Sequence, residues 1–198
     1  MWTQSRAILP EQLELADRFF AATEERLRPG TVLGSGDRIR GLADPAAVAV
    51  VESPRAAIER IRLDIEAFAT QERLDHVVMV NLASTEPPPD RPIPREFAEL
   101  EPLLDDAAGC PLPSSSLYFL GAAAAGASYV NFTPSAGSTP TCLQQVALDH
   151  GITHAGSDGK TGETLLKSVL APLFPGRNLE VMSWVGHNIF GNLDGKVL

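Results

Sequence analysis

The stretch most suited to chemistry in this sequence is GSDGKTGETLLK, residues 156–167. A short apolar run ending at Ala155 leads into it, and residues 164–170 have apolar side chains at helical spacing. This order predicts a strand, a glycine-containing loop and a helix. The first amides of a helix lack internal partners and the helix dipole is positive there, so the loop is suited to bind an anion such as a phosphate.

Three residues of this stretch favour anion binding. Gly159 and Gly162 allow the backbone to approach a ligand closely, and Lys160 adds a full positive charge. An ordinary glycine-containing turn with an exposed lysine is the alternative, because short Gly, Lys and Thr motifs also occur by chance. The G-x-x-x-x-G-K-[ST] order of a Walker A loop is absent.

Composition and charge restrict the class of protein. The chain has 198 residues, of which 44% are hydrophobic and 21% charged, which is typical of one globular domain or part of a larger one. A net charge of −9 argues against nucleic acid or an anionic membrane as partner. The sequence has no apolar run long enough to span a membrane and no signal-peptide pattern, so we expect a cytoplasmic protein.

The cysteine and histidine residues predict no metal site. Cys110 and Cys142 form neither a disulfide framework nor a zinc-ligand spacing, and we expect both to be reduced. His150 and His154 are four residues apart, as in a helical metal pair, but Gly151 between them indicates the end of a helix. A surface or partly buried role for both histidines is favoured.

The first third of the chain predicts two helices. Residues 10–27 have the pattern of an amphipathic helix, and Gly34-Ser35-Gly36 indicates a surface turn rather than a dinucleotide loop, because no apolar helix follows it. After a short apolar segment, residues 47–51, Ser53 and Pro54 occupy N-cap and N1 positions of a helix that reaches about Thr70. Its predicted buried stripe is Ile58, Ile61, Ile65 and Phe68.

A predicted strand at residues 76–82 is followed by a possible ligand-binding loop. The run HVVMVNL is continuously apolar and β-branched, as in a strand buried within a parallel sheet. Residues 83–86 follow its carboxyl end, where open α/β sheets bind ligands. Five prolines between 87 and 94 then predict a surface loop.

Strands and helices alternate through the remaining sequence, which predicts an α/β fold. Ser114-Ser115-Ser116 is expected to cap a buried helix over 117–127, and a strand follows at 129–132. Asn131 within this strand must find hydrogen-bond partners, either backbone or ligand. We expect Thr139 and Pro140 to cap a helix that ends near Gly151, and a further strand at 179–185.

Several separated motifs resemble the myo-inositol-1-phosphate synthase family in order and spacing. They are NFTPS from residue 131, AGSDGKTGETLLKSVLAP from residue 155 and GHNIFGNLDG from residue 186. Upstream, RIRLDIEAFATQERLDHVVMVNLASTEP resembles the helix and strand that lead to the family's NAD-contacting loop. The resemblance implies an incomplete Rossmann-like NAD-binding portion over residues 1–114. Residues 115–198 would form part of an α/β catalytic and oligomerisation portion with a largely open sheet.

The resemblance also implies an activity. Enzymes of this family convert D-glucose 6-phosphate to 1D-myo-inositol 3-phosphate, through oxidation, enolisation, aldol closure and reduction with a tightly held NAD. This is an isomerase reaction of inositol and phospholipid biosynthesis. The implied cofactor is NAD, the implied substrate is glucose 6-phosphate, and the implied assembly is self-association to a homotetramer.

Three groups of site residues follow from the resemblance. The residues near the nicotinamide half of NAD are Ala83, Ser84, Thr85 and Asp158. The residues that hold the substrate phosphate are Thr161, Gly162, Glu163 and Lys167. The residues that provide charge or hydrogen bonds at the reacting sugar are Asp158, Lys160, Asn188, Asn192 and Asp194.

Two departures from the family pattern leave alternatives open. No glycine-rich Rossmann unit precedes residue 45, and the family's main catalytic lysines lie beyond the segment that corresponds to 186–195. We therefore expect a truncated or partial family member. The alternative is a non-catalytic module that binds a sugar phosphate or contributes to an oligomer interface. An NAD-dependent oxidoreductase of other specificity is a third reading, which lacks a complete dinucleotide fingerprint.

Overall fold

The structure is a computed structural model that describes residues 12, 16–17, 23, 26–45, 52–159 and 162–185. The expected helix over residues 10–27 lies almost entirely outside the described residues, and the apolar segment 47–51 lies wholly outside them.

Three parallel strands form the sheet and confirm the α/β class. They are β1 (Val78–Asn81), β2 (Ser128–Asn131) and β3 (His154–Gly156), paired in the order β1-β2-β3. Their register places Asn81 beside Asn131, and Asn131 beside Gly156. The carboxyl ends of all three strands therefore meet at one edge, and the loops that leave them are neighbours.

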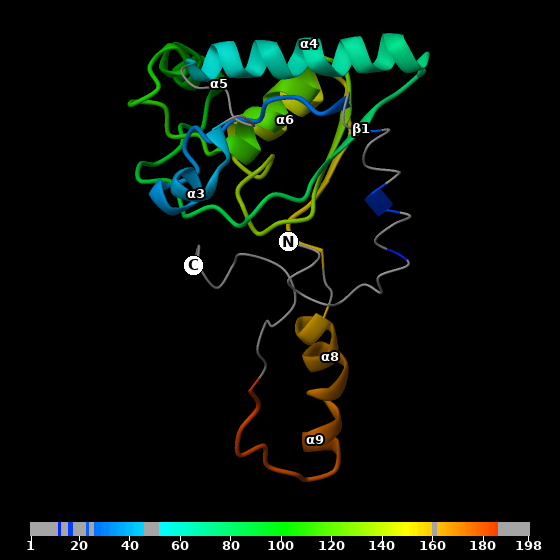
Figure 1. Ribbon diagram of the computed structural model, residues 1–198. Coiled ribbons are helices and arrows are strands. Elements are labelled where there is room, and N and C mark those ends of the chain that lie inside the picture. The colour runs from blue at the N-terminus through cyan, green and yellow to red at the C-terminus, as the bar shows by residue number, and fades with distance from the viewer. Residues whose placement is uncertain are drawn as a thin grey trace.

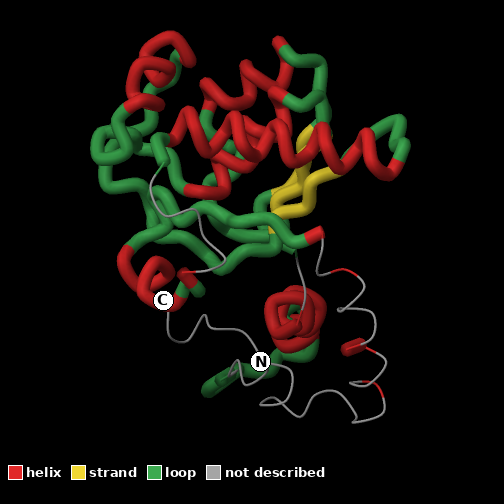
Figure 2. Tube along the Cα trace, turned by 45° about the horizontal axis from the view of Figure 1, so that its top comes forward, coloured by secondary structure: helices red, strands yellow, loops and turns green. Residues whose placement is uncertain are grey.

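Helices cover one face of this sheet. The longest is α4 (Pro54–Glu72), which lies across α6 (Ser114–Ala124), as Figure 1 shows. The other helices with described bounds are α3 (Asp37–Leu42), α5 (Phe97–Leu100), η3 (Glu101–Asp105), α7 (Thr141–Asp149), α8 (Gly162–Leu170) and α9 (Leu173–Gly176). In the ribbon of Figure 1 α8 and α9 project away from the layer that contains the strands, α4 and α6, and the tube of Figure 2 agrees.

The core lies where α6 packs between α4 and the sheet. A Cβ added to Gly121 of α6 would lie 2.5 Å from Cγ2 of Ile61, so the two helices touch at this glycine. On the other side of α6, the fully buried rings of Phe119 and Tyr129 meet edge-on with centroids 5.5 Å apart. Each such buried aromatic or branched side chain stabilises the fold by about 1.5–3 kcal/mol.

Helix α4 begins as the sequence predicts. The hydroxyl oxygen of Ser53 accepts a hydrogen bond from the Ala56 amide at 3.2 Å, and Pro54 is the first helical residue. Ile61 and Ile65 are buried, but the predicted burial of Phe68 is wrong, since its side chain is 40% exposed. The last turns of α4, which carry Phe68, extend beyond α6 (Figure 1).

The predicted burial of the first strand is wrong for one of its two faces. Met79 and Asn81 lie on the face that α6 covers, whereas Val78 and Val80 are 53% and 46% exposed on the other face. An apolar run indicates that both faces of a strand suit burial, but burial itself needs a second packed layer. That layer is absent among the described residues.

One predicted helix cap, part of a second one and one predicted strand are also wrong. Ser114-Ser115-Ser116 form the first turn of α6 rather than its cap, and the helix ends at Ala124. Pro140 is the N-cap residue of α7, which ends at Asp149 as predicted, but the Thr139 hydroxyl donates to the carbonyl of Ala136 and does not cap the helix. Residues 179–185 are irregular and mostly exposed, with Met182 at 89%, so the described segment contains no strand.

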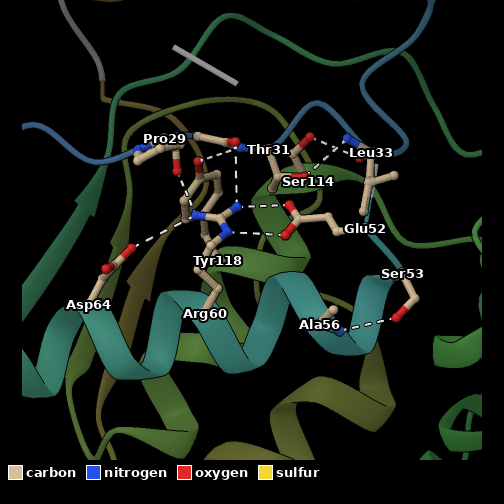
Figure 3. Close-up of polar contacts among 11 residues, drawn as sticks. Pro29, Thr31, Leu33, Glu52, Ser53, Ala56, Arg60, Asp64, Ser114 and Tyr118 are labelled. Atoms are coloured by element: carbon tan, nitrogen blue, oxygen red, sulfur yellow. Dashed lines mark hydrogen bonds and ion pairs between the residues drawn. The ribbon is translucent and has the colours of Figure 1, made fainter. Parts of the chain in front are cut away.

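Arg60 of α4 ties the segment before α3 to the helical layer (Figure 3). Its guanidinium donates two hydrogen bonds to the Glu52 carboxylate, at 3.0 and 2.8 Å, and one to the carbonyl oxygen of Pro29 at 2.5 Å. Nearby, the Thr31 amide donates to the hydroxyl of Tyr118 on α6 at 3.0 Å. These contacts hold residues 29–33 against both α4 and α6.

Replacing Arg60 by methionine is expected to lower the free energy of unfolding by about 2 kcal/mol, because it leaves the 11% exposed Glu52 carboxylate without its partner. The matched control is Arg62→Met on the same helix. Within the described part of the chain Arg62 pairs with Glu59 and Glu66 of the same helix and with no other acid, so Arg62→Met should lower the free energy of unfolding markedly less. Urea denaturation measures both, and equal losses would contradict this account.

Candidate functional site

A buried pair of amide side chains lies at the carboxyl edge of the sheet. Asn81 Nδ2 donates to Asn131 Oδ1 at 3.0 Å, and Asn131 Nδ2 donates to the Ser135 carbonyl at 2.8 Å. The amide and hydroxyl of Thr133 both donate to the same Asn131 oxygen, at 3.1 and 2.8 Å. The hydrogen-bond partners that the sequence requires for Asn131 are therefore protein groups, and they shape the turn after β2.

The three predicted cofactor residues after β1 lie at this edge. The Ala83 amide donates to Asn81 Oδ1 at 3.2 Å, which fixes the start of the loop. Ser84 and Thr85 are half-buried, and within the described ranges their hydroxyls make no hydrogen bond to the protein. The loop can thus offer two hydroxyl groups to a ligand.

Thr85 also lines a pocket of about 370 Å³, together with residues 35–39, Pro87 and Pro88. The predicted turn at Gly34-Ser35-Gly36 forms one wall, and both glycines have positive φ, 69° and 86°. Placing this turn on the surface was wrong for Ser35, which is 3% exposed. The reason is close packing, since a Cβ on Gly34 would lie 2.3 Å from the carbonyl oxygen of Leu112.

Glu86 ends this loop and is buried, with 8% of its surface exposed. Its carboxylate oxygens accept hydrogen bonds from the Ser115 amide, at 3.1 and 3.3 Å, so Glu86 caps α6 in place of the predicted serines. Its own amide donates to the Ser135 hydroxyl at 2.9 Å. Burial raises the pKa of Glu86, and hydrogen bonds from Ser115, Ser114 and Ser135 oppose that rise.

The raised pKa predicts a pH-dependent stability. Between the pKa of an unfolded glutamate, about 4.3, and the higher native pKa of Glu86, the native state binds more protons, so this contribution to stability falls as pH rises. Glu86→Gln removes the titration. Its free energy of unfolding relative to wild type should therefore increase from about pH 4.5 upward, in urea denaturation at a series of pH values. A difference in stability between Glu86→Gln and wild type that stays constant across the pH series would count against the linkage.

The glycine-rich motif has the predicted order: β3 comes first, irregular backbone follows at residues 157–159, and α8 comes after it. The loop begins close against β2: the Gly159 amide donates to the Phe132 carbonyl at 3.2 Å, and a Cβ on Gly159 would lie 2.4 Å from Cδ1 of that ring. Asp158, directly before Gly159, has φ 81°, a conformation that is rare outside glycine. Such strain is characteristic of functional loops.

The structure brings only some of the predicted site residues together. Residues 83–85 and Asp158 lie at the same sheet edge, on either side of the end of β2. Gly162 and Glu163 begin α8, and Lys167 lies in its last turn with Nζ 5.8 Å from the ring centre of Trp184. The predicted site residues outside the described part of the chain are Lys160, Thr161, Asn188, Asn192 and Asp194.

His154 contacts neighbouring protein side chains, and the two cysteines are at least partly buried. His154 Nδ1 lies 2.9 Å from the Ser138 hydroxyl, and its ring meets Phe119 edge-on at 5.9 Å. Cys110 and Cys142 are free thiols, and burial raises the pKa of both. Among the described residues, no cluster of three or more His, Cys, Asp and Glu side chains could hold a metal. None of the described helices is both long and apolar enough to cross a membrane.

A parallel sheet with polar loops at its carboxyl edge defines an α/β protein of the kind that binds small ligands at that edge. A family model described as myo-inositol-1-phosphate synthase, for an NAD-binding segment, matches residues 31–179. A second model with the same description matches residues 162–198. The chain therefore belongs to the myo-inositol-1-phosphate synthase family, a family of isomerases.

Individual relatives agree with this family. The chain is 33% identical over 144 residues to inositol-3-phosphate synthase 1 of Bacteroides thetaiotaomicron, covering 71% of this chain and 33% of that protein. It is 30% identical over 207 residues to human inositol-3-phosphate synthase 1, covering 100% of this chain and 32% of the human protein. The chain thus spans about a third of the length of these curated relatives.

Two solved structures share the fold. Inositol-3-phosphate synthase from Caenorhabditis elegans matches with a TM-score of 0.70 at 20% identity, over 89% of this chain and 34% of that one. A myo-inositol-1-phosphate synthase-related protein from Thermotoga maritima matches with a TM-score of 0.54 at 21% identity, over 75% of this chain and 37% of that one.

Proposed function

We propose that this chain is part of an NAD-dependent enzyme that cyclises D-glucose 6-phosphate to 1D-myo-inositol 3-phosphate. Family membership supports the reaction, and one observation in the structure carries the proposal. The loop of Ser84 and Thr85 after β1 and the strained loop of Asp158 after β3 flank the same end of β2. The division into an NAD-binding portion over 1–114 and a catalytic portion over 115–198 stays a prediction.

The residues at the sheet edge fit the nicotinamide half of NAD. Ser84 and Thr85 supply hydroxyls that have no partner in the described part of the chain, and the pocket of about 370 Å³ beside Thr85 has room for a nicotinamide or ribose ring. When bound, NAD would accept a hydride from the sugar and return it. We assign only the nicotinamide half of NAD to these loops.

We assign the sugar phosphate to the start of α8. Helix starts favour anions, and the amides of Thr161, Gly162 and Glu163 would face the phosphate oxygens. Lys160, and Lys167 about one turn after Glu163, would add positive charge. Asp158 would orient the reacting carbon, and the polar side chains of Asn188, Asn192 and Asp194 would hold the sugar hydroxyls.

Calorimetric titration tests binding separately from turnover. Purified protein should bind glucose 6-phosphate more tightly than glucose, and NAD should strengthen that binding. Gly162→Leu should weaken sugar-phosphate binding more than Glu163→Gln, because bulk at position 162 obstructs the backbone donors whereas the second change keeps them. Folded protein that gives no heat at millimolar ligand would remove the proposal. Binding without formation of inositol phosphate would favour the non-catalytic alternative.

We expect the chain to associate with itself. Leu165, Leu166 and Val169 on α8 are 50%, 58% and 66% exposed, and the uncovered face of β1 exposes Val78 and Val80. Exposed apolar groups of this kind favour association. Light scattering coupled to size-exclusion chromatography should detect a species larger than 21.1 kDa, and Leu166→Glu should reduce it. A wild-type chain that is monomeric at all concentrations would contradict this expectation.

A further inference from the structure

We infer that Glu86 is a positioning residue: its buried carboxylate holds the loop of residues 83–85 against the start of α6 and thereby sets the affinity of that loop for its ligand. The proposed function supplies only the identity of the ligand, the nicotinamide half of NAD.

Glu86 joins three separate segments. Its amide donates to the Ser135 hydroxyl at 2.9 Å, in the turn after β2. Its carboxylate accepts from the Ser115 amide in the first turn of α6, which is 29 residues further along the chain. Through this one residue the loop after β1 is attached both to the loop after β2 and to the core helix.

The loop between the two anchors is short. The Ala83 amide is held by Asn81 Oδ1 at 3.2 Å, and Glu86 holds the other end, so only Ser84 and Thr85 lie between fixed points. Both side chains are half-buried and have no hydrogen bond to the rest of the described protein. Their position therefore depends on the anchors at either end rather than on contacts of their own.

The carboxylate is suited to this attachment. The residue before α6, Pro113, provides no side-chain cap, and the amides of Ser116 and Leu117 both donate to the Pro113 carbonyl. The Ser115 amide therefore needs an acceptor from another segment, and the Glu86 carboxylate is that acceptor. The Ser115 side chain continues the connection, since its hydroxyl oxygen accepts from the Gly137 amide at 3.1 Å. Removing the Glu86 acceptor would free the loop and leave a buried amide unpaired.

Hydrogen exchange by mass spectrometry on the full chain tests the positioning role without any ligand. Glu86→Met has similar length but no acceptor, whereas Glu86→Gln keeps one acceptor oxygen. Amide exchange at residues 83–85 should become at least about tenfold faster in Glu86→Met and stay within about threefold of wild type in Glu86→Gln. The control Gln145→Ala removes an exposed hydrogen bond within α7, to Asp149, and should leave exchange at 83–85 unchanged.

NAD titration of the same variants provides the second readout. NAD affinity should fall about tenfold in Glu86→Met and be largely retained in Glu86→Gln. Unchanged exchange at 83–85 in Glu86→Met, or unchanged NAD affinity despite faster exchange, would overturn the inference. Should Glu86→Met fail to fold, Ser135→Ala removes the partner of the Glu86 amide and must speed exchange at 83–86 for the inference to stand. If Glu86→Met speeds exchange at 83–85 but the wild-type chain binds no NAD, the proposed function is overturned while the positioning of the loop by Glu86 stands.

Discussion

Replacing Gly156 by alanine is expected to lower the free energy of unfolding by about 3–5 kcal/mol. An added Cβ would lie 2.2 Å from the carbonyl oxygen of Asn131, which belongs to the backbone of β2. Neither strand can move aside without breaking their pairing, in which Asn131 and Gly156 are register partners. The φ of 96° at Gly156 adds the cost of a left-handed conformation. Urea denaturation measures the loss.

Gly151→Ala is the matched control for this prediction. Gly151 also has positive φ, 63°, but nothing lies within 4 Å of an added Cβ. Gly151→Ala should lower the free energy of unfolding by the backbone strain alone, about 1 kcal/mol. If the two variants lose equal stability, the close contact between β2 and β3 contributes nothing and the explanation fails.

Asn131→Ala is expected to lower the free energy of unfolding by about 3–4 kcal/mol. The side chain is 1% exposed, and its four hydrogen bonds connect Asn81, Thr133 and Ser135. After truncation the Asn81 amide and the Ser135 carbonyl lose a partner in a site that water reaches poorly. The same method measures this variant.

Gln145→Ala is the control for Asn131→Ala. The Gln145 side chain is exposed on α7 and makes one hydrogen bond, to Asp149 at 2.8 Å. We expect a loss below about 0.5 kcal/mol. A loss of similar size at Asn131 would mean that the amide network at the sheet edge does not stabilise the fold.

Gly156 and Asn131 also affect the loops at the sheet edge. Gly156 and Asn131 together set how closely the loop that carries Asp158 follows the end of β2. Asn131 also orders the turn that contains Ser135, the partner of the Glu86 amide. Weakening either residue should therefore disturb both loops that we assign to the nicotinamide half of NAD.

Local pattern in the sequence was sufficient for several elements. Ser53 and Pro54 identify the start of α4 because capping is a contact between neighbours in the chain. The apolar runs before Ala83 and Gly156 identify β1 and β3, and the glycine motif indicates the turn into α8. The polarity of Asn131 within an apolar run correctly required a hydrogen-bond partner.

Most of the failures share one cause, which is dependence on residues distant in sequence. Three consecutive serines resemble a cap, yet the α6 cap is the carboxylate of Glu86, 29 residues earlier. The apolar residues of β1 and of 179–185 suit a buried strand, but burial and pairing require neighbouring elements that the pattern of one segment does not specify.

The sequence by itself determined the α/β class, the order of strand, loop and helix, and the family, because periodicity, capping and motif spacing are local properties of the chain. Only the tertiary structure decided which polar groups meet at the sheet edge. Asn81, Glu86 and Asn131 become neighbours through parallel strand register and through the packing of α6, and those contacts join residues dozens of positions apart. The buried attachment of the loop at 83–85 is therefore a product of folding rather than of any motif.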